Sequence, residues 1–274
     1  MPLKLMYITN RPEIALIAET NGVDRIFIDL ETLGKDERQK NMDTVKSHHT
    51  VEDVRRLSEV LTKAELLVRV NPWNKNSKAE IDHVIDAGAD IVMLPMWKTK
   101  EEVVNFLNAV AGRVKTMLLL ETREAAECLD DVLTLSGIDE IHIGLNDLHL
   151  SYKMSFMFEL LADGTVERLC AKIEKKGIPY GFGGVGRIGE GLLLAEHIIC
   201  EHYRLKSHGV ILSRSFCNQD QQKGLSELRD LFQVNIKKLR AFEKEAERYS
   251  PEQFENCRKS VIEEVQNVVE GKRS

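Results

Sequence analysis

Eight short apolar segments recur along the chain, separated by stretches with the spacing of amphipathic helices. The apolar runs are continuous rather than alternating, which is typical of parallel strands covered on both faces. In the segment 77–88, for example, Ile81, Val84 and Ile85 fall on one helix face. The eight apolar segments are 3–9, 25–30, 65–70, 90–96, 115–121, 140–145, 179–184 and 209–216.

This alternation constrains the fold class. Eight strand–helix repeats within about 215 residues favour a (β/α)8 barrel over a doubly wound open sheet, although the pattern alone allows both. We therefore expect an α/β fold, a (β/α)8 TIM barrel over residues 1–218 that carries the active site, with a C-terminal helical extension over 219–274.

The extension has no strand signal and is expected to form two amphipathic helices separated at Ser250-Pro251. Its first helix has an apolar stripe that we expect either to pack across the outside of the barrel or to dock on a neighbouring subunit. We expect a homo-oligomer formed through these helices. The stripe consists of Leu228, Leu231, Phe232, Ile236 and Leu239.

Composition excludes several classes of function. The formal net charge of −6, without a basic stripe, offers no surface for nucleic acid. No apolar segment approaches the roughly 20 residues that span a bilayer, and no signal-peptide pattern appears, so we expect a cytoplasmic protein that does not bind membranes.

The cysteines are scattered without C-x-x-C spacing, which predicts reduced, mostly buried thiols rather than disulfides or a zinc site. They are Cys128, Cys170, Cys200, Cys217 and Cys257.

Polar residues follow most of the apolar segments. In a parallel barrel all strand C-termini point to one face, where the loops hold the chemistry, so these residues are expected to converge. They are Asp29, Glu31, Arg69, Asn71, Glu121, Asn146, Asp147, Arg187, Ser213 and Arg214.

Glu121 and Asp147 end neighbouring strands, and neither has a strong cation beside it in sequence. Their repulsion predicts a divalent ion between them, and oxygen ligands favour Mg²⁺, with Mn²⁺ or Co²⁺ as alternatives, over zinc. The competing interpretation is that each merely caps the next helix; Thr122 is a better cap than Glu121.

Arg69 has a planar fork that suits a carboxylate or an oxygen on which negative charge develops. A metal ion beside such a clamp is an apparatus for a 2-oxo acid, because the ion can chelate the keto and carboxylate oxygens and stabilise an enolate. A plain structural ion pair is the alternative for Arg69.

Five motifs resemble, in order and spacing, those of the HpcH/HpaI aldolase and citrate lyase β-subunit family, in the phosphoenolpyruvate/pyruvate-binding barrel superfamily. The resemblance covers about residues 20–155, and it implies a (β/α)8 barrel whose C-terminal helices are exchanged between subunits. The motifs are GVDRIFIDLE, LLVRVNPWN, IDAGADIVMLPM, LLLETREAAECLDDVL and GIDEIHIGLNDLHLS.

The resemblance implies roles for individual residues. Glu121 and Asp147 would be metal ligands, Arg69 would contact a carboxylate or enolate oxygen of pyruvate or oxaloacetate, and backbone N–H groups of Leu145 and Asn146 would touch the substrate carboxylate. We therefore expect a divalent-metal-dependent lyase of the aldolase type that cleaves or forms a C–C bond in a small 2-oxo acid through a pyruvate enolate. The alternatives are a citrate-lyase-like acyl-CoA lyase and a non-catalytic metabolite-binding barrel.

One departure from the family pattern concerns acid–base chemistry. Aldolases of this family usually carry a histidine directly after D-x-E, where this chain has Thr32. The long segment 32–50 contains His48 and His49, which are candidate acid–base residues. The alternative is a solvated loop whose histidines simply precede the helix N-cap Thr50.

The other departure is the glycine-rich stretch YGFGGVGRIGEG at 180–191. It contains G-x-G-x-x-G but comes too late in the chain for a dinucleotide-binding fold. We expect Gly183, Gly184 and Arg187 to bind a substrate phosphate or carboxylate. Glycines required only for packing are the alternative.

Arg214, near the end of the last apolar segment, is a further candidate for holding an anionic part of the substrate. An ion pair with Asp29 or Glu31 is an equal alternative.

Overall fold

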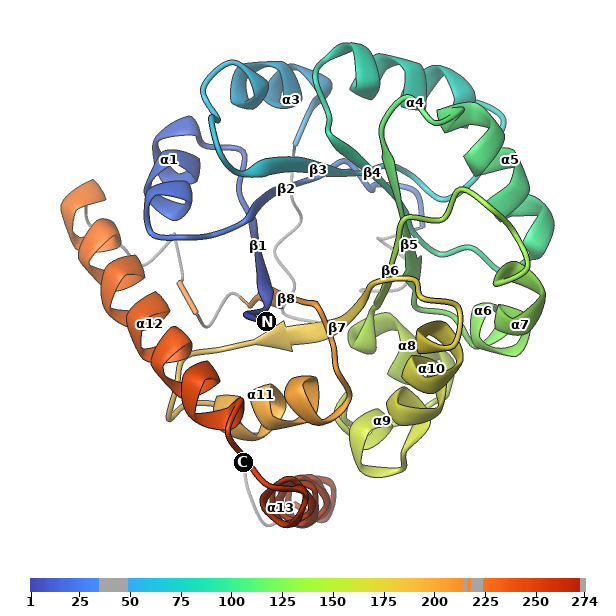
Figure 1. Cartoon of the computed structure of the whole chain (residues 1–274). Coiled ribbons are helices and arrows are strands. Elements are labelled where there is room, and N and C mark those ends of the chain that lie inside the picture. The colour runs from blue at the N-terminus through green and yellow to red at the C-terminus, as the bar shows by residue number, and fades with distance from the viewer. Residues whose placement is uncertain (35–48, 214–215, 218–223, 272–274) are drawn as a thin grey trace.

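Eight parallel strands pair in chain order, and β1 pairs with β8, so that they close into a barrel (Figure 1). The computed structural model describes residues 1–34, 49–213, 216–217 and 224–271. The predicted TIM barrel and all eight predicted strands are confirmed. The strands are β1 (Lys4–Ile8), β2 (Arg25–Asp29), β3 (Glu65–Arg69), β4 (Ile91–Leu94), β5 (Lys115–Leu120), β6 (Glu140–Ile143), β7 (Tyr180–Val185) and β8 (Gly209–Leu212).

Helices surround the barrel and alternate with its strands (Figure 1). Side chains at the N-cap set several of their starts, as Thr50 and Thr99 do by forming capping boxes. The helices are α1 (Pro12–Thr20), α3 (Val51–Ser58), α4 (Ser77–Asp86), α5 (Lys100–Val110), α6 (Arg123–Glu127), α7 (Leu129–Val132), α8 (Leu145–Ser151), α9 (Glu159–Ala162), α10 (Thr165–Glu174), α11 (Ala195–Arg204), α12 (Leu225–Ala246) and α13 (Pro251–Val269).

The segment 123–137 differs from the single helix that its apolar spacing suggests. It forms α6 and α7, which are joined at Cys128, where φ is −95° and ψ is 8°. This ψ lies outside the α-helical range, so the backbone changes direction although the apolar residues keep a helical period. The buried side chains of both short helices, including Ala125 and Leu129, still face the core.

Two apolar layers hold the barrel together. A small cluster fills its interior, and a much larger one lies between the strands and the surrounding helices. Continuous apolar strands are explained by this arrangement, because successive residues point alternately into one layer and the other. The interior cluster consists of Met6, Phe27, Leu67, Ile91, Met93, Met117 and Leu119.

An ion network crosses the barrel interior at the N-terminal ends of the strands. Arg25, which is 1% exposed, donates from Nε to Glu65 at 2.9 Å and from Nη1 and Nη2 to the two oxygens of Glu140 at 2.7 and 2.5 Å. Lys115 binds Glu65, and Lys4 lies 3.9 Å from Glu140. Burial alone would lower the pKa of Arg25, but its two carboxylate partners outweigh burial and raise it.

The C-terminal helices pack against the same chain. Helix α12 lies between α1 and α11, where the eighth helix of a barrel completes the ring (Figure 1). Its apolar stripe is buried there, except for the half-buried Leu231. Helix α13 begins at Pro251, with Ser250 as its N-cap, as predicted, and packs against α11 and α9.

Within the residues that the structure describes, none of the helices combines the length and the apolar character that crossing a membrane requires.

Removing the buried guanidinium is expected to destabilise the fold. Arg25→Met leaves the carboxylates of Glu65 and Glu140 without their central cation, and breaking a buried pair costs about 3–5 kcal/mol. Urea unfolding monitored by circular dichroism measures this loss. Arg55→Ala, which breaks the exposed pair with Glu52, is the matched control and should cost less than about 0.5 kcal/mol. Similar losses for the two variants would contradict a stabilising role for the network.

Candidate active site

Four carboxylates and one guanidinium gather at the C-terminal ends of the strands. Asp29 ends β2 and Glu31 follows it, Arg69 ends β3, Glu121 follows β5, and Asp147 lies in the first turn of α8 after β6. Arg69 forms ion pairs with both acids of β2 and interacts electrostatically with Glu121, which in turn faces Asp147. The structure therefore brings together the three residues on which the metal and substrate prediction rests.

Strand register sets the position of Arg69. Asp29 and Arg69 are direct partners across the β2–β3 pair. Arg69 Nε and Nη2 donate to the two oxygens of Asp29 at 2.9 and 2.8 Å, and Nη2 lies 3.4 Å from Glu31. Burial opposes the charge of Arg69, but these two carboxylates outweigh it and raise its pKa. The structural ion pair that the sequence left open is thus present, and no hydrogen bond among the described residues uses Nη1.

Glu121 is a buried acid whose ionised form is disfavoured by its surroundings. Its side chain is 3% exposed. Burial raises its pKa well above the usual value, the nearby carboxylate of Asp147 raises it further, and Arg69 opposes both effects without cancelling them. An ionised Glu121 therefore needs a cation close to it.

Gly144 and Met96 shape the space around this carboxylate. A Cβ atom on Gly144 would lie 2.9 Å from Glu121 Oε2, so a larger residue would displace the acid. The pairing of Leu120 with Ile143 brings the two strand ends to this distance. On another side, the N–H of Met96 donates to Oε1 at 3.1 Å, and Met96 has a φ of 53°, which is uncommon for a residue with a side chain.

Neither acid of the predicted metal pair is an N-cap. Thr122 caps α6, as its hydroxyl accepts from the N–H of Ala125 at 3.1 Å. The N-cap of α8 is Gly144, and Asp147 lies three residues further on, in the first turn of that helix. Leu145 and Asn146 are the first residues of α8, at the same end of the barrel.

His49 and Thr32 flank the end of β2. The ring Nδ1 of His49 accepts a hydrogen bond from the N–H of Asp29 at 3.0 Å, so the neutral ring carries its proton on Nε2. Thr32 donates to Asn71 Oδ1 from its N–H at 2.9 Å and from its hydroxyl at 3.3 Å. Asn71 is itself held by Glu80.

The glycine-rich stretch has clear packing requirements. Gly183, with φ of 54°, lies where a Cβ atom would be 2.7 Å from the side chain of Leu145. A Cβ atom on Gly184 would be 3.2 Å from the carbonyl oxygen of Ile211. These contacts explain both glycines without a ligand, which leaves their predicted role in substrate binding as a proposal.

Arg187 contacts a backbone carbonyl group and a nearby glutamate. Its Nε donates to the carbonyl oxygen of Phe216 at 3.0 Å, and Nη1 lies 3.6 Å from Glu190. His48 and Arg214, both predicted site residues, lie outside the described residues.

The donor set suits a hard divalent ion. In the described part of the chain, no three His, Cys, Asp or Glu side chains are grouped closely enough to enclose a metal ion by themselves. Among the described residues, Arg69 is the guanidinium that acts on these carboxylates, and burial together with Asp147 still raises the pKa of Glu121. Oxygen donors with room for water or substrate oxygens are what Mg²⁺ prefers, and Glu121 and Asp147 would hold it.

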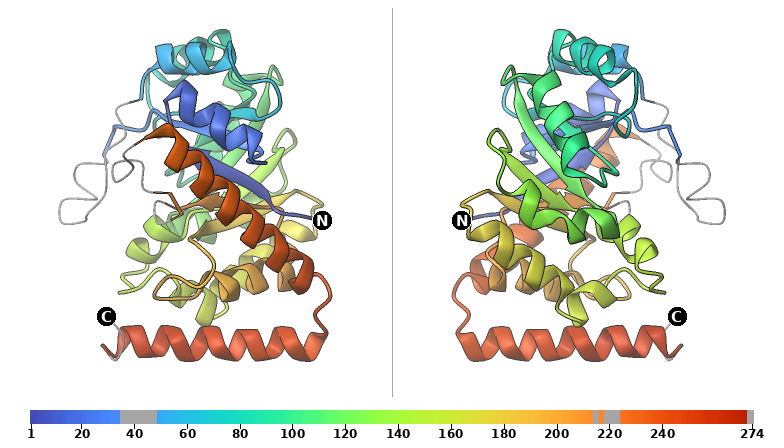
Figure 2. Two further views of the ribbon diagram at one scale, coloured as in Figure 1. Left: turned by 90° about the vertical axis from the view of Figure 1, so that its left-hand side faces the viewer. Right: turned by 90° about the vertical axis from the view of Figure 1, so that its right-hand side faces the viewer.

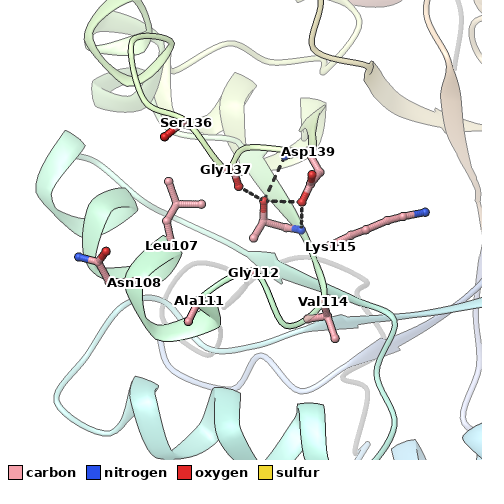
Figure 3. Close-up of a pocket in the computed structure, with 10 residues that line it drawn as sticks. Leu107, Asn108, Ala111, Gly112, Val114, Lys115, Ser136, Gly137 and Asp139 are labelled. Atoms are coloured by element: carbon pink, nitrogen blue, oxygen red, sulfur yellow. Dashed lines mark hydrogen bonds between the residues drawn. The ribbon is translucent and has the colours of Figure 1, made fainter.

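A surface hollow of about 550 Å³ lies at the opposite end of the barrel (Figure 3). It is lined by the end of α5, the start of β5 and the segment before β6, including Ala111, Lys115 and Asp139. Polar groups there bond to one another, since the Thr116 hydroxyl donates to the carbonyl oxygen of Gly137. Because it adjoins Lys115, at the other end of the strand that precedes Glu121, this hollow is not part of the candidate site.

Comparisons with known proteins identify a sequence family and similar folds. The sequence profile described as HpcH/HpaI aldolase/citrate lyase matches residues 4–157. Curated protein sequences give no significant match. Among solved structures, an HpcH/HpaI aldolase from Desulfitobacterium hafniense DCB-2 is similar, with a TM-score of 0.60, 16% identity, and coverage of 77% of this chain and 86% of the other.

Two further structures share the fold. An HpcH/HpaI aldolase/citrate lyase family protein from Burkholderia cenocepacia J2315 has a TM-score of 0.59 and 14% identity, with coverage of 83% of this chain and 95% of the other. The citrate lyase β subunit from M. tuberculosis, complexed with oxaloacetate and magnesium, has a TM-score of 0.54 and 15% identity, with coverage of 90% of this chain and 97% of the other.

Neutralising Glu121 is expected to stabilise the metal-free protein. Its pKa is higher in the folded than in the unfolded state, so its ionisation disfavours folding increasingly as the pH rises from the usual value of 4.5 towards the raised one. Glu121→Gln should therefore gain roughly 1–3 kcal/mol in urea unfolding at pH 7.5 with a chelator, and little at pH 4.

Glu124→Gln provides the control, because Glu124 is half exposed and pairs only loosely with Lys98, at 3.6 Å. Its stability should change by less than about 0.5 kcal/mol at either pH. A Glu121→Gln variant that is less stable than the parent at pH 7.5 without metal would show that the acid is compensated within the fold.

Proposed function

Because the chain belongs to the HpcH/HpaI aldolase/citrate lyase family, a family of lyases, we propose that it is a divalent-metal-dependent carbon–carbon lyase acting on a small 2-oxo acid through a pyruvate enolate. The observation that carries this proposal is the buried Glu121 carboxylate, whose charge faces Asp147 and is not balanced by Arg69. A cation at this position resolves the imbalance. The presence of oxaloacetate and magnesium in the citrate lyase β subunit supports the same choice of ligand class.

Glu121 and Asp147 would hold the ion, which is Mg²⁺ in our proposal, with Mn²⁺ or Co²⁺ as alternatives. Once bound, the ion would polarise the keto and carboxylate oxygens of the substrate and stabilise the enolate charge. The N–H of Met96 holds Oε1 of Glu121, and Gly144 leaves room for Oε2, so the carboxylate would be in position before the ion binds.

Arg69 is proposed to bind the substrate carboxylate or the developing enolate oxygen. Asp29 fixes the guanidinium plane through two hydrogen bonds, which orients the remaining Nη1 before the substrate arrives. Backbone N–H groups of Leu145 and Asn146, at the start of α8, would donate hydrogen bonds to the oxygens of the substrate carboxylate. Gly183, Gly184 and Arg187 remain proposed contacts to the rest of the substrate.

His49 is proposed to take the part of the histidine that Thr32 replaces. Its hydrogen bond with the N–H of Asp29 anchors it beside the Asp29–Arg69 pair and fixes the tautomer with a proton on Nε2. In this tautomer the Nε2–H group would donate a hydrogen bond to a substrate oxygen on which negative charge develops.

The replacement of that histidine by Thr32 also favours a second candidate, a citrate-lyase-like acyl-CoA lyase, which uses the same metal and arginine. Calorimetric titration with coenzyme A separates the two proposals. Micromolar binding would favour the acyl-CoA lyase, whereas no binding together with pyruvate release would favour the aldolase. Binding of pyruvate or oxaloacetate without turnover of either substrate class would instead indicate a metabolite-binding barrel.

The central experiment measures pyruvate release from 4-hydroxy-2-oxo acids. We expect release with Mg²⁺, Mn²⁺ or Co²⁺ and its loss after thorough chelation. Glu121→Gln and Asp147→Asn should each lower kcat/KM at least about 100-fold and weaken metal binding in calorimetry. Arg69→Lys should mainly lower the affinity for oxalate, a mimic of the enolate.

Asp131→Asn, which changes an acid of α7 away from the cluster, is the control and should leave metal binding unchanged. Full activity that survives chelation would refute the proposed metal role.

A pair of variants tests His49. His49→Asn places an acceptor near the position of Nδ1, so the bond from Asp29 can persist, but it removes the Nε2 proton. We expect kcat to fall about 100-fold while metal and oxalate affinities stay unchanged. His49→Ala should show the same loss together with a weaker fold. If His49→Asn retains more than a third of the parent activity, His49 serves only to anchor the end of β2.

A further inference from the structure

Two cysteines that are far apart in sequence meet between α11 and α13. Cys200 lies in the middle of α11 and Cys257 in the second turn of α13, and their Sγ atoms are 3.1 Å apart, with Cys257 as the hydrogen-bond donor. A disulfide bond is about 2.0 Å long, so the sulfur atoms need to approach by only about 1 Å.

Contacts that follow Cys257 along α13 hold this helix in register. Arg258 Nη1 forms an ion pair with Glu167 of α10 at 3.0 Å. Two turns further on, Glu264 lies 3.2 Å from His197 Nδ1, and Val261 is buried between them in sequence. The thiol pair is therefore part of a fitted helix–helix contact, which Figure 2 shows along the outside of the barrel.

We propose that Cys200 and Cys257 form a reversible disulfide within one chain when the protein meets a peroxide. The thiolate of Cys257 attacks the peroxide oxygen, which gives a sulfenic acid and releases one water after protonation. The sulfur of Cys200 then attacks the sulfenic sulfur, loses its proton and releases a second water. In total, two thiols and one hydrogen peroxide give one disulfide and two waters.

The environments of the two thiols assign these roles. Cys200 is 1% exposed, whereas Cys257 is half-buried and accessible from the surface. Burial raises the pKa of Cys200, and neighbouring Cys257, Glu201 and Glu245 raise it further. Cys257 is thus the thiol that reacts first, and Cys200 resolves the intermediate.

The bond would fasten the C-terminal helix to the barrel. Cys200 and Cys257 are 57 positions apart, and the closed segment includes β8 and α12, so oxidation restricts a long stretch of the unfolded chain. It would also keep α13 on its own subunit and so prevent its exchange.

Treatment of the folded full-length protein with a small excess of hydrogen peroxide tests the proposal. We expect two of the five thiols to become unreactive, the intact mass to fall by about 2 Da, and peptide mapping to find Cys200 joined to Cys257. The midpoint of thermal unfolding should rise by about 5 °C and return after reduction with dithiothreitol.

Cys257→Ser and, independently, Cys200→Ala should lose these changes, whereas Cys128→Ser, which removes another half-buried thiol, should keep them. Five reactive thiols remaining after oxidation, a pair other than Cys200 with Cys257, or a covalent dimer on a non-reducing gel would each overturn the proposal.

Discussion

The burial of Glu121 beside Asp147, at the C-terminal end of the barrel, is the constraint on which the rest of the candidate site depends. Strand register places Arg69 directly opposite Asp29, so its guanidinium is largely used by the acids of β2. Glu121 is buried beside Asp147, and burial and Asp147 raise its pKa by more than the charge of Arg69 lowers it. Among the described residues, this raised pKa marks the position at which the proposed divalent ion would be bound most favourably.

The two ends of the barrel differ in how their buried charged side chains are paired. At the N-terminal end, Arg25 meets Glu65 and Glu140 with good geometry, and lysines at the strand starts support the same acids. At the C-terminal end, as far as the structure describes it, four carboxylates gather around Arg69. Because the same eight strands carry both ends, stability and chemistry are separated along the strand direction, as is usual for this architecture.

The sequence was sufficient for the strands and for the residues at their ends, because continuous apolar runs reveal covered parallel strands and Glu121 and Asp147 stand directly after such runs. It was not sufficient for features that depend on three-dimensional approach. The left-handed backbone of Met96 has no sequence signature, and the need for Gly144 appears only when the register puts it against Glu121. The contact between Cys200 and Cys257 could not be predicted from their positions in the sequence either, because it depends on how α13 packs against α11.

The exchange of a histidine for Thr32 changes where acid–base chemistry can arise. Both donors of Thr32 bind Asn71, which Glu80 holds in place, so this threonine organises the loop and offers no titratable group. His49 directly precedes Thr50, the N-cap of α3, and its ring accepts a hydrogen bond from the N–H of Asp29 at the end of β2. Thr32 and His49, at the two ends of the β2–α3 connection, would then supply a fixed edge of the site and a hydrogen-bond donor, respectively. In that case the role of the histidine that Thr32 replaces would fall to His49, which is distant in sequence from the D-x-E motif and meets the end of β2 only in the folded chain.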